Sequence, residues 1–453
     1  KNISLYIINA TKIAAEIGLG GRTNTILQSA FFKITNIIPY EDAVTYMKQA
    51  ILKSYGKKGE NVVNMNYAAV DRGGEYTKVE IPADWKDITA KFENPNKDRL
   101  APAFVKEIAD EVNSQCGDRL PVSKFIDIQD GTMPNGTAAY EKRGVAVKVP
   151  EWKSENCIQC NTCAFVCPHA AIRPFILTAD EAAKAPASVK KAAGKAQLKE
   201  YTYALSVSVA DCTGCGNCVD VCPAKEKALE MVSYQADLQE QENFNWLNEH
   251  VGYKENILNK EGNVKNAQFA QPLFEFSGAC AGCGETPYIK TITQLWGDHM
   301  MIANATGCSS IYGASFPATP YCTNAQGHGP AWANSLFEDF CEFGLGMKLG
   351  SDRARATVAN LMEQGLSCSC CSDEMKALFT QWLENKNDAK ITREVADKLV
   401  PLMEACGCDT CKALLEYKHF IPSRSQWIIG GDGASYDIGY GGLDHVLASG
   451  ENV

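Results

Sequence analysis

One motif occurs twice near the middle of the chain, and it decides how that part folds. The first copy is Cys157-Ile-Gln-Cys160-Asn-Thr-Cys163-Ala-Phe-Val-Cys167-Pro168, and the second is Cys212-Thr-Gly-Cys215-Gly-Asn-Cys218-Val-Asp-Val-Cys222-Pro223. Both copies read C-x2-C-x2-C-x3-C-P. Two intervening residues let a tight loop point three thiolates at one centre. The proline after the fourth cysteine suits the start of a helix, so the chain leaves the loop in another direction.

This spacing is typical of segments that hold a pair of [4Fe–4S] clusters, in which the fourth cysteine of each run binds the cluster of the other run. Zinc binding, or thiols that merely pack, is the alternative, and eight cysteines in duplicated register disfavour it. The motif therefore predicts a segment that carries electrons. We assign Cys157, Cys160, Cys163 and Cys222 to one cluster and Cys212, Cys215, Cys218 and Cys167 to the second.

Length and composition indicate the number of domains and the class of protein. The 453 residues are too many for one ordinary core, and about three domains are expected. Hydrophobic residues make up 45% and charged residues 22%, which is typical of a globular protein, and no apolar run is long enough to span a bilayer. The 20 cysteines, in cluster spacing, indicate metal and a reducing, anaerobic cytoplasm instead of disulfides.

Partners and chain ends can also be addressed from the sequence. The net charge of −10 argues against nucleic acid as a partner, and the N-terminus has no secretory signal pattern. The chain starts at Lys1 without a methionine and stops at Val453 in mid-pattern. We therefore expect both ends to continue in a longer protein.

Residues 1–95 are expected to be the end of an α/β domain. Helical patterns run over residues 10–18, 22–32 and 41–55, and glycines close the first of them. That glycine turn is either a plain helix cap or a site that presents backbone N–H groups to an anion.

Residues 96–136 contain a predicted helix over residues 103–115 within a path rich in polar, Pro and Gly residues. This composition indicates a connector that wraps over its neighbours. Between the two cysteine motifs, residues 178–198 are rich in Ala and Lys and predict a helical excursion on the surface. Residues 202–209 alternate in polarity, which predicts a strand.

The third region carries further metal-binding chemistry. Cys280-Ala-Gly-Cys283-Gly-Glu285 is followed by Asn304-Ala-Thr-Gly-Cys308, and three thiolates suit a [4Fe–4S] cluster or a zinc site. Later, the apolar run Trp427-Ile-Ile leads into Gly430-Gly431-Asp432-Gly433. A strand that ends in Gly-Asp-Gly places a carboxylate where a hard cation and a diphosphate can meet. A simple Asp-Gly turn is the alternative.

Together these motifs resemble the pyruvate:ferredoxin oxidoreductases, the single-chain 2-oxoacid oxidoreductases of anaerobes. The resemblance covers essentially the whole chain. Besides the duplicated motif, it is most specific over residues 130–140 (Asp-Gly-Thr-Met-Pro-Asn-Gly-Thr-Ala-Ala-Tyr), 277–285, 304–310 and 430–450.

The resemblance implies further cofactor sites. Gly431, Asp432 and Gly433 would begin a thiamine diphosphate motif whose Asp binds Mg²⁺. A third [4Fe–4S] cluster next to the thiamine would be held by Cys280, Cys283 and Cys308, with Glu285 in the same motif. The fourth ligand of that cluster and the rest of the Mg²⁺ loop are expected beyond residue 453. The glutamate that activates the thiamine lies, in the family, in an N-terminal domain, and no catalytic residue is predicted in this chain.

The fold class expected from these observations is multidomain α/β and α+β. Residues 1–95 would be the end of an α/β domain on the CoA side, and residues 96–136 the connector. Residues 137–253 would be a ferredoxin-like domain with two [4Fe–4S] clusters. Residues 254–453 would be the start of an α/β thiamine diphosphate-binding domain that carries the third, proximal cluster.

The function implied by the resemblance is oxidative decarboxylation of pyruvate with CoA to acetyl-CoA and CO₂. Electrons would pass through three [4Fe–4S] clusters to ferredoxin or flavodoxin, in a homodimer of the longer protein. The 453 residues alone are expected to be inactive. The alternatives are an oxidoreductase for another 2-oxoacid and a non-catalytic electron-transfer module, although a pure carrier requires neither Gly-Asp-Gly nor the third cysteine group.

Residues 351–425 depart from the family pattern. This largely helical stretch resembles an insertion, and its cysteines form a C-x2-C…C-x2-C pattern that can bind zinc or a fourth cluster. Reduced thiols or a protective surface disulfide are the alternatives. The cysteines concerned are Cys368, Cys370, Cys371, Cys406, Cys408 and Cys411.

Overall fold

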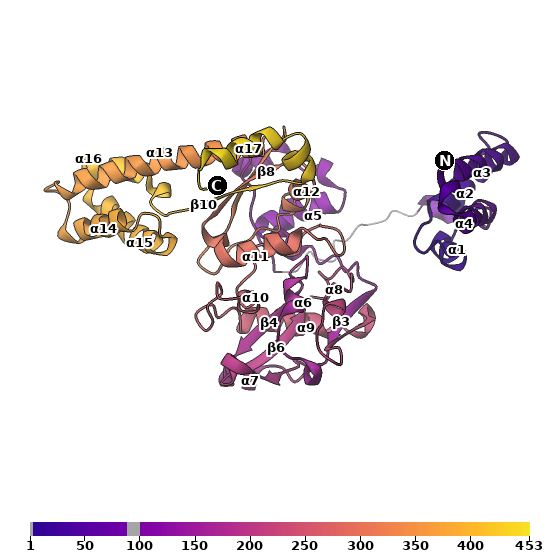
Figure 1. The fold of residues 1–453 in the computed structure, drawn as a ribbon, viewed down its shortest axis with the longest axis horizontal. Helices are drawn as coiled ribbons and strands as arrows, with labels where there is room; N and C mark the ends of the chain where they lie inside the picture. Colours follow the sequence, from indigo (N-terminus) through magenta and orange to yellow (C-terminus); the bar gives the residue numbers. More distant parts are fainter. Residues whose placement is uncertain (1–2, 88–99) are drawn as a thin grey trace. The chain divides into compact units, whose positions relative to one another are not determined.

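The computed structural model describes residues 3–87 and 100–453. The chain divides into two compact units, Lys1–Glu93 and Asn94–Val453, and each is described by itself (Figure 1). The predicted boundary between residues 95 and 96 lies outside the described residues. The boundaries at residues 136/137 and 253/254 stay predictions.

The first unit is a group of amphipathic helices beside an antiparallel ribbon. Small and branched apolar side chains fill the space between the helices, among them Ile13, Ile26 and Val70. The three predicted helices are confirmed, and Gly18 closes the first with φ +87°. The fourth helix was not predicted. The elements are β1 (Leu5–Ile7), α1 (Ala10–Glu16), α2 (Asn24–Thr35), α3 (Tyr40–Tyr55), α4 (Glu60–Arg72) and β2 (Thr77–Val79), which pairs with β1.

The described part of the second unit, from residue 100 on, starts with short helical turns in the region of the predicted connector helix. A π-helical turn at Val105–Ala109 continues into α5 (Asp110–Asn113), and 3₁₀ turns follow. The segment lies over a distant loop, because the ring of Phe104 packs against the ring of Phe316. The backbone N–H of Gly136 also donates to the carbonyl oxygen of Tyr321 at 2.7 Å.

The duplicated motif lies between strands that pair crosswise. The first motif connects β3 (Lys148–Trp152) to β4 (Ile172–Leu177), and the second connects β6 (Thr202–Val207) to β7 (Leu229–Ser233). β3 pairs antiparallel with β7, and β4 pairs antiparallel with β6. Each half of the duplication therefore contributes one strand to each sheet. The short helices α6 (Thr162–Phe165) and α8 (Asn217–Asp220) contain the third cysteines of the two motifs, Cys163 and Cys218.

The prediction of a helical excursion over residues 178–198 is wrong for most of its length. Only α7 (Ala179–Lys184) is α-helical, and a single 3₁₀ turn covers Ala196–Leu198. Beyond it the chain forms β5 (Ala192–Ala193), which pairs with β6, because Pro186 and Gly194 interrupt the helix pattern. A Cβ on Gly194 would lie 1.9 Å from the carbonyl oxygen of Leu198, so glycine is required at this fold-back. The predicted strand over residues 202–209 is confirmed by β6.

The third region contains a parallel sheet in the order β10-β8-β9. Apolar side chains alternate along β10, so Ile428 packs with α13 and α17 on one face whereas Ile429 packs with α11 on the other. Helices therefore cover both faces of the sheet, as a parallel sheet requires. α9 (Gln239–His250) precedes this region and packs on β6. The elements of the third region are α10 (Val264–Ala267), α11 (Thr286–Trp296), β8 (Met300–Ala305), α12 (Cys308–Gly313), β9 (Ala331–Ser335), α13 (Phe340–Leu366), β10 (Ser425–Ile429) and α17 (Tyr440–Ser449).

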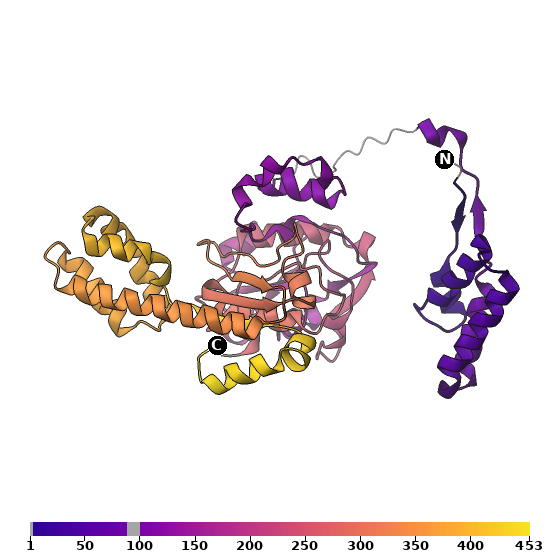
Figure 2. The same ribbon diagram turned by 90° about the horizontal axis from the view of Figure 1, so that it is seen from above.

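The predicted helical character of residues 351–425 is confirmed, and this stretch forms a lobe that projects from the sheet (Figure 2). The distal half of α13 packs against α14 (Asp373–Glu384), α15 (Ala389–Cys406) and α16 (Asp409–Glu416). The lobe has its own core, built around Met362, Trp382 and Leu399. Within residues 3–87 and 100–453, no helix is both long enough and apolar enough to cross a membrane.

Candidate metal centres

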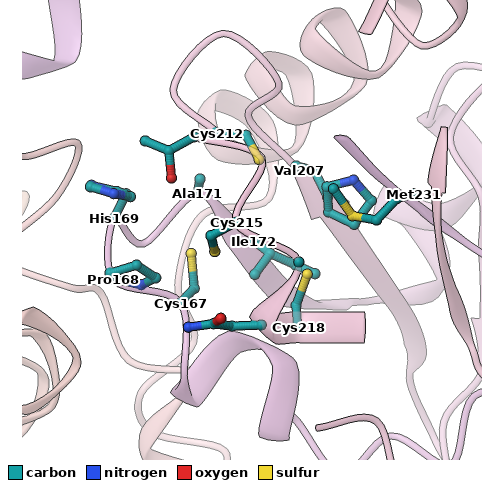
Figure 3. A pocket seen from close by; sticks show the side chains of 14 residues that line it. Cys167, Pro168, His169, Ala171, Ile172, Val207, Cys212, Cys215, Cys218 and Met231 are labelled. Atoms are coloured by element: carbon teal, nitrogen blue, oxygen red, sulfur yellow. The ribbon is translucent and has the colours of Figure 1, made fainter. Parts of the chain in front are cut away.

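The cysteines of the duplicated motif line separate cavities. One cavity, lined also by Tyr203, Leu205 and Leu229, is bounded by Cys157, Cys160, Cys163 and Cys222. The other, lined also by Ile172, Val207 and Met231, is bounded by Cys167, Cys212, Cys215 and Cys218 (Figure 3). Each cavity thus collects three cysteines of one motif and the last cysteine of the other, which is the grouping that the sequence predicted. The ligation itself stays a prediction.

The crossed strand pairing explains this grouping. Each motif leads from a strand of one sheet to a strand of the other, so its fourth cysteine is carried away from the first three. Cys167 precedes β4, whose neighbour β6 leads directly into the second motif. Cys222 likewise precedes β7, whose neighbour β3 leads into the first.

Left-handed backbone residues shape both loops at equivalent positions. In the second motif these are Gly214 and Gly216, with φ +69° and +82°. In the first motif Gln159 and Asn161 adopt φ +59° and +60°, which is uncommon for residues with a side chain.

Side-chain hydrogen bonds hold the two non-glycine residues in this conformation. The Gln159 amide donates to the carbonyl oxygen of Ala193 at 2.8 Å and accepts from the N–H of Lys195 at 2.9 Å. The Asn161 side chain donates to the carbonyl oxygen of Lys265 at 3.0 Å and accepts from the Tyr203 hydroxyl at 2.9 Å. The mispredicted segment around β5 therefore supports the first cysteine loop.

Backbone N–H groups point at the cysteine sulfur atoms, and burial raises the pKa values of several of the thiols. The N–H of Gly214 lies 3.4 Å from the sulfur of Cys212, and that of Ala228 lies 3.4 Å from the sulfur of Cys222. Burial raises the pKa of Cys212 to about 12, and it raises the pKa values of Cys163 and Cys218 further. Thiolates in such places require a cation to offset their desolvation. The donor set therefore fits iron–sulfur clusters.

A lysine that the sequence analysis missed lies against the first motif, beside Cys163 and Cys167. Lys290 on α11 is buried, and its ammonium group donates to the carbonyl oxygens of Ala164 and Phe165, the latter at 2.9 Å. Burial lowers the pKa of Lys290 to about 8, and the nearby Cys167 and Cys163 oppose that shift. The only signal in the sequence was a lysine on the otherwise inward-facing side of an amphipathic helix.

The third cysteine group begins in a loop that packs directly on the second motif. A Cβ on Gly282, between Cys280 and Cys283, would lie 3.6 Å from the Cβ of Cys215. His169, two residues after Cys167, joins the same region, because its Nδ1 lies 3.1 Å from the carbonyl oxygen of Ser277. Burial lowers the pKa of His169.

Cys308 and Asp432 lie at the same edge of the parallel sheet. Cys308 begins α12 just after β8, and Asp432 lies three residues after the end of β10. β8 and β10 are paired in parallel, with Asn304 opposite Ile429, so both residues lie at the carboxyl edge where open α/β sheets bind ligands. The Asp432 side chain is exposed there, and Gly431 and Gly433 flank it with space for added atoms.

Glu285 lies at the N-cap of α11, at the end of the Cys280–Cys283 loop. Burial and the Glu285 carboxylate together raise the pKa of Tyr312, which belongs to the helix that Cys308 begins. Glu285 thus joins the two segments that carry the third cysteine group. The chain offers Asp432 as one carboxylate ligand for a cation at this edge.

Models of known protein families match three segments of the chain, and one of these segments contains the duplicated cysteine motif. A family described as "Pyruvate ferredoxin/flavodoxin oxidoreductase" matches residues 1–76, and one described as "4Fe-4S dicluster domain" matches residues 153–225. A "Domain of unknown function" matches residues 91–146.

Curated relatives align with the whole chain. The "Pyruvate-flavodoxin oxidoreductase" of Klebsiella pneumoniae is 51% identical over 458 residues, and the chain covers 38% of its length. The "Pyruvate:ferredoxin oxidoreductase" of Moorella thermoacetica is 50% identical over 464 residues, with 39% of its length covered. The "Probable pyruvate-flavodoxin oxidoreductase" of Escherichia coli is 43% identical, with 38% covered. The chain thus spans less than half the length of these relatives.

Proposed function

The chain belongs to the pyruvate ferredoxin/flavodoxin oxidoreductase family, and from this we propose that it is the electron-carrying part of such an enzyme. The complete protein would oxidise pyruvate with CoA to acetyl-CoA and CO₂ and would reduce ferredoxin or flavodoxin. When bound, [4Fe–4S] clusters supply one-electron transfer, and thiamine diphosphate supplies carbanion stabilisation.

The observation that carries this proposal is the composition of the two cysteine cavities. Each contains three cysteines of one motif and the last of the other, as the crossed ligation of paired [4Fe–4S] clusters requires. In this proposal all eight cysteines are ligands. The apolar side chains of Leu205, Val207 and Met231 exclude water, and exclusion of water helps to set reduction potentials.

A third [4Fe–4S] cluster and the thiamine site complete the proposal. Cys280, Cys283 and Cys308 would hold the cluster, with Glu285 beside it. Asp432, flanked by Gly431 and Gly433, would bind Mg²⁺ and through it the diphosphate. The shared sheet edge of Cys308 and Asp432 supports this arrangement, and so does the close packing of the Cys280–Cys283 loop on the second motif.

The same proposal extends to domain organisation. Residues 137–253 would form the ferredoxin-like domain, residues 254–453 the start of the thiamine diphosphate-binding domain, and residues 1–95 part of the CoA side. The second candidate function is an electron-transfer module without catalysis, which the complete cysteine sets of residues 157–222 favour.

A chimera separates the two functions. The segment of the Moorella thermoacetica enzyme that aligns with this chain is replaced by it, and anaerobic reduction of a viologen dye is followed with pyruvate and CoA. We expect pyruvate-dependent reduction by the chimera, whereas the 453 residues alone should accept electrons only from dithionite.

The matched control is the chimera with Cys212→Ser, which should lose dye reduction together with about four irons. A chimera that keeps its full iron content but shows no pyruvate-dependent reduction would contradict the enzyme role. The electron-transfer module without catalysis would then be the remaining function. Turnover of pyruvate by the 453 residues alone would contradict the assignment of this chain as one part of the enzyme.

A further inference from the structure

The helical lobe holds a cysteine cluster that the proposed function does not use. The turn between α13 and α14 carries Cys368, Cys370 and Cys371, and the turn between α15 and α16 carries Cys406 and Cys408 at its edges. Cys411 follows on the first turn of α16. Residues more than thirty positions apart in sequence are thus brought together at one end of the lobe.

The sulfur atoms form one continuous group. Those of Cys368, Cys371 and Cys408 all lie within 4.8 Å of one another, and so do those of Cys406, Cys408 and Cys411. Cys371 and Cys411 are also buried in the same core of the lobe. Cys408 therefore joins two triplets, and the pairs 368/371 and 408/411 face each other.

Exposure sets Cys370 apart from the candidate ligands, and a backbone hydrogen bond sets apart Cys406, which is as partly buried as Cys368 and Cys408. Cys371 and Cys411 are buried in the core of the lobe, whereas Cys368 and Cys408 are partly buried beside them. Cys370 is exposed. The thiol of Cys406 lies 3.4 Å from the carbonyl oxygen of Cys370 and can donate to it. Cys406 thus has a backbone partner, and the two C-x2-C pairs remain as a set of four.

The spacing favours one ion over an iron–sulfur cube. Four thiolates on a single tetrahedral Zn²⁺, with Zn–S bonds of about 2.3 Å, lie about 3.8 Å apart. A cube has an iron at each ligated corner, so its thiolates stand farther apart. The duplicated motif provides the comparison: among the described residues, no three of its cysteine sulfurs fall within 4.8 Å of one another.

We propose that Cys368, Cys371, Cys408 and Cys411 bind one zinc ion, which joins the α13–α14 turn to the α15–α16 turn. Four thiolates without an open position are typical of a structural zinc site. The ion would offset the desolvation of the buried Cys371 and Cys411 and would fix the lobe against the rest of α13. No redox chemistry is assigned to it.

The test measures zinc and iron in the anaerobically purified full chain. We expect about one zinc per chain in addition to the iron of the clusters. The double variant C368S/C408S should lose that zinc and keep its iron content. Cys370→Ser is the matched control, because its exposed side chain lies in the same turn, and it should keep both metals.

Further readouts separate zinc loss from misfolding and from zinc bound elsewhere. On the unmodified chain, X-ray absorption at the zinc edge should report four sulfur ligands at about 2.3 Å. Zinc that disappears in Cys212→Ser instead of C368S/C408S would overturn the assignment. Iron lost in C368S/C408S would indicate a cluster at this place. A chain without zinc whose four cysteines resist alkylation until reduced would contain disulfides and would equally refute the proposal.

Discussion

Replacing Gly214 with Ala tests how closely the backbone confines the second cysteine loop. Gly214 has φ +69°, and its N–H lies 3.4 Å from the sulfur of Cys212. An added Cβ would lie 2.8 Å from the carbonyl oxygen of Lys148 and 3.3 Å from the Cβ of Ala146. Gly216 provides the matched control, because it has φ +82° and a Cβ there would meet no atom within 4 Å.

The two substitutions share the free-energy cost of a left-handed backbone, and they differ in whether the added Cβ meets other atoms. Left-handed backbone costs an L-residue about 1–2 kcal/mol, and loss of unfolded-chain freedom offsets about 0.4–1 kcal/mol of it. Both variants carry this net cost. Gly214→Ala alone must also displace the backbone of β3, which adds about 1–3 kcal/mol. The excess of Gly214→Ala over Gly216→Ala corresponds to about 5- to 150-fold in the equilibrium for holding the cluster.

The assay is the anaerobic release of iron to a chelator, followed together with the electron paramagnetic resonance spectrum of the reduced protein. Gly216→Ala should retain both clusters, with iron release close to that of the unmodified chain. Gly214→Ala should lose the signal of the Cys212, Cys215, Cys218 and Cys167 cluster and keep the other. Equal behaviour of the two variants would refute the role assigned to the contact with β3.

The remaining predictions concern charge. Lys290→Met removes a buried ammonium group beside Cys163 and Cys167. Reduction of the neighbouring clusters should become less favourable by on the order of 1 kcal/mol, so their reduction potentials should fall by about 40 mV for one electron. In potentiometric titrations the exposed control Lys184→Met should leave the potentials unchanged, and an equal shift in both variants would contradict a local effect. Asp432→Ala in the chimera should raise the Mg²⁺ and thiamine diphosphate concentrations required for dye reduction by about tenfold or more. The control Asp437→Ala, on the adjoining turn, should not change these concentrations. An unchanged Mg²⁺ dependence in Asp432→Ala would mean that Gly431–Gly433 is only a structural turn.

The cysteine loops were predictable because their chemistry is local. Thiolate spacing within eleven residues fixes which cysteines share a loop, and the motif's repetition implies crossed pairing. The cavities lined by Cys157 to Cys222 follow from that repetition. The amphipathic helices of the lobe were equally accessible, since their apolar residues recur at helical spacing.

Tertiary contacts explain what the sequence did not reveal. Residues 178–198 have helix-favouring composition, yet Ala192 and Ala193 gain hydrogen bonds to β6 that override it. Lys290 becomes a buried charge only when α11 docks on α6. Nothing local to Gly282 indicated that its loop would pack against Cys215, and the shared edge of Cys308 and Asp432 depends on strand order.

Cys167→Ser tests the crossed ligation most directly. The measurement is the electron paramagnetic resonance spectrum of the dithionite-reduced chain, compared with that of Cys157→Ser, in which the cluster beside Cys167 in sequence loses a ligand. We predict that Cys167→Ser alters the signal that Cys212→Ser alters, because these residues line the same cavity. Cys157→Ser should instead alter the other signal. If Cys167→Ser changes the signal that belongs to Cys157, Cys160 and Cys163, the assignment of the two clusters is wrong.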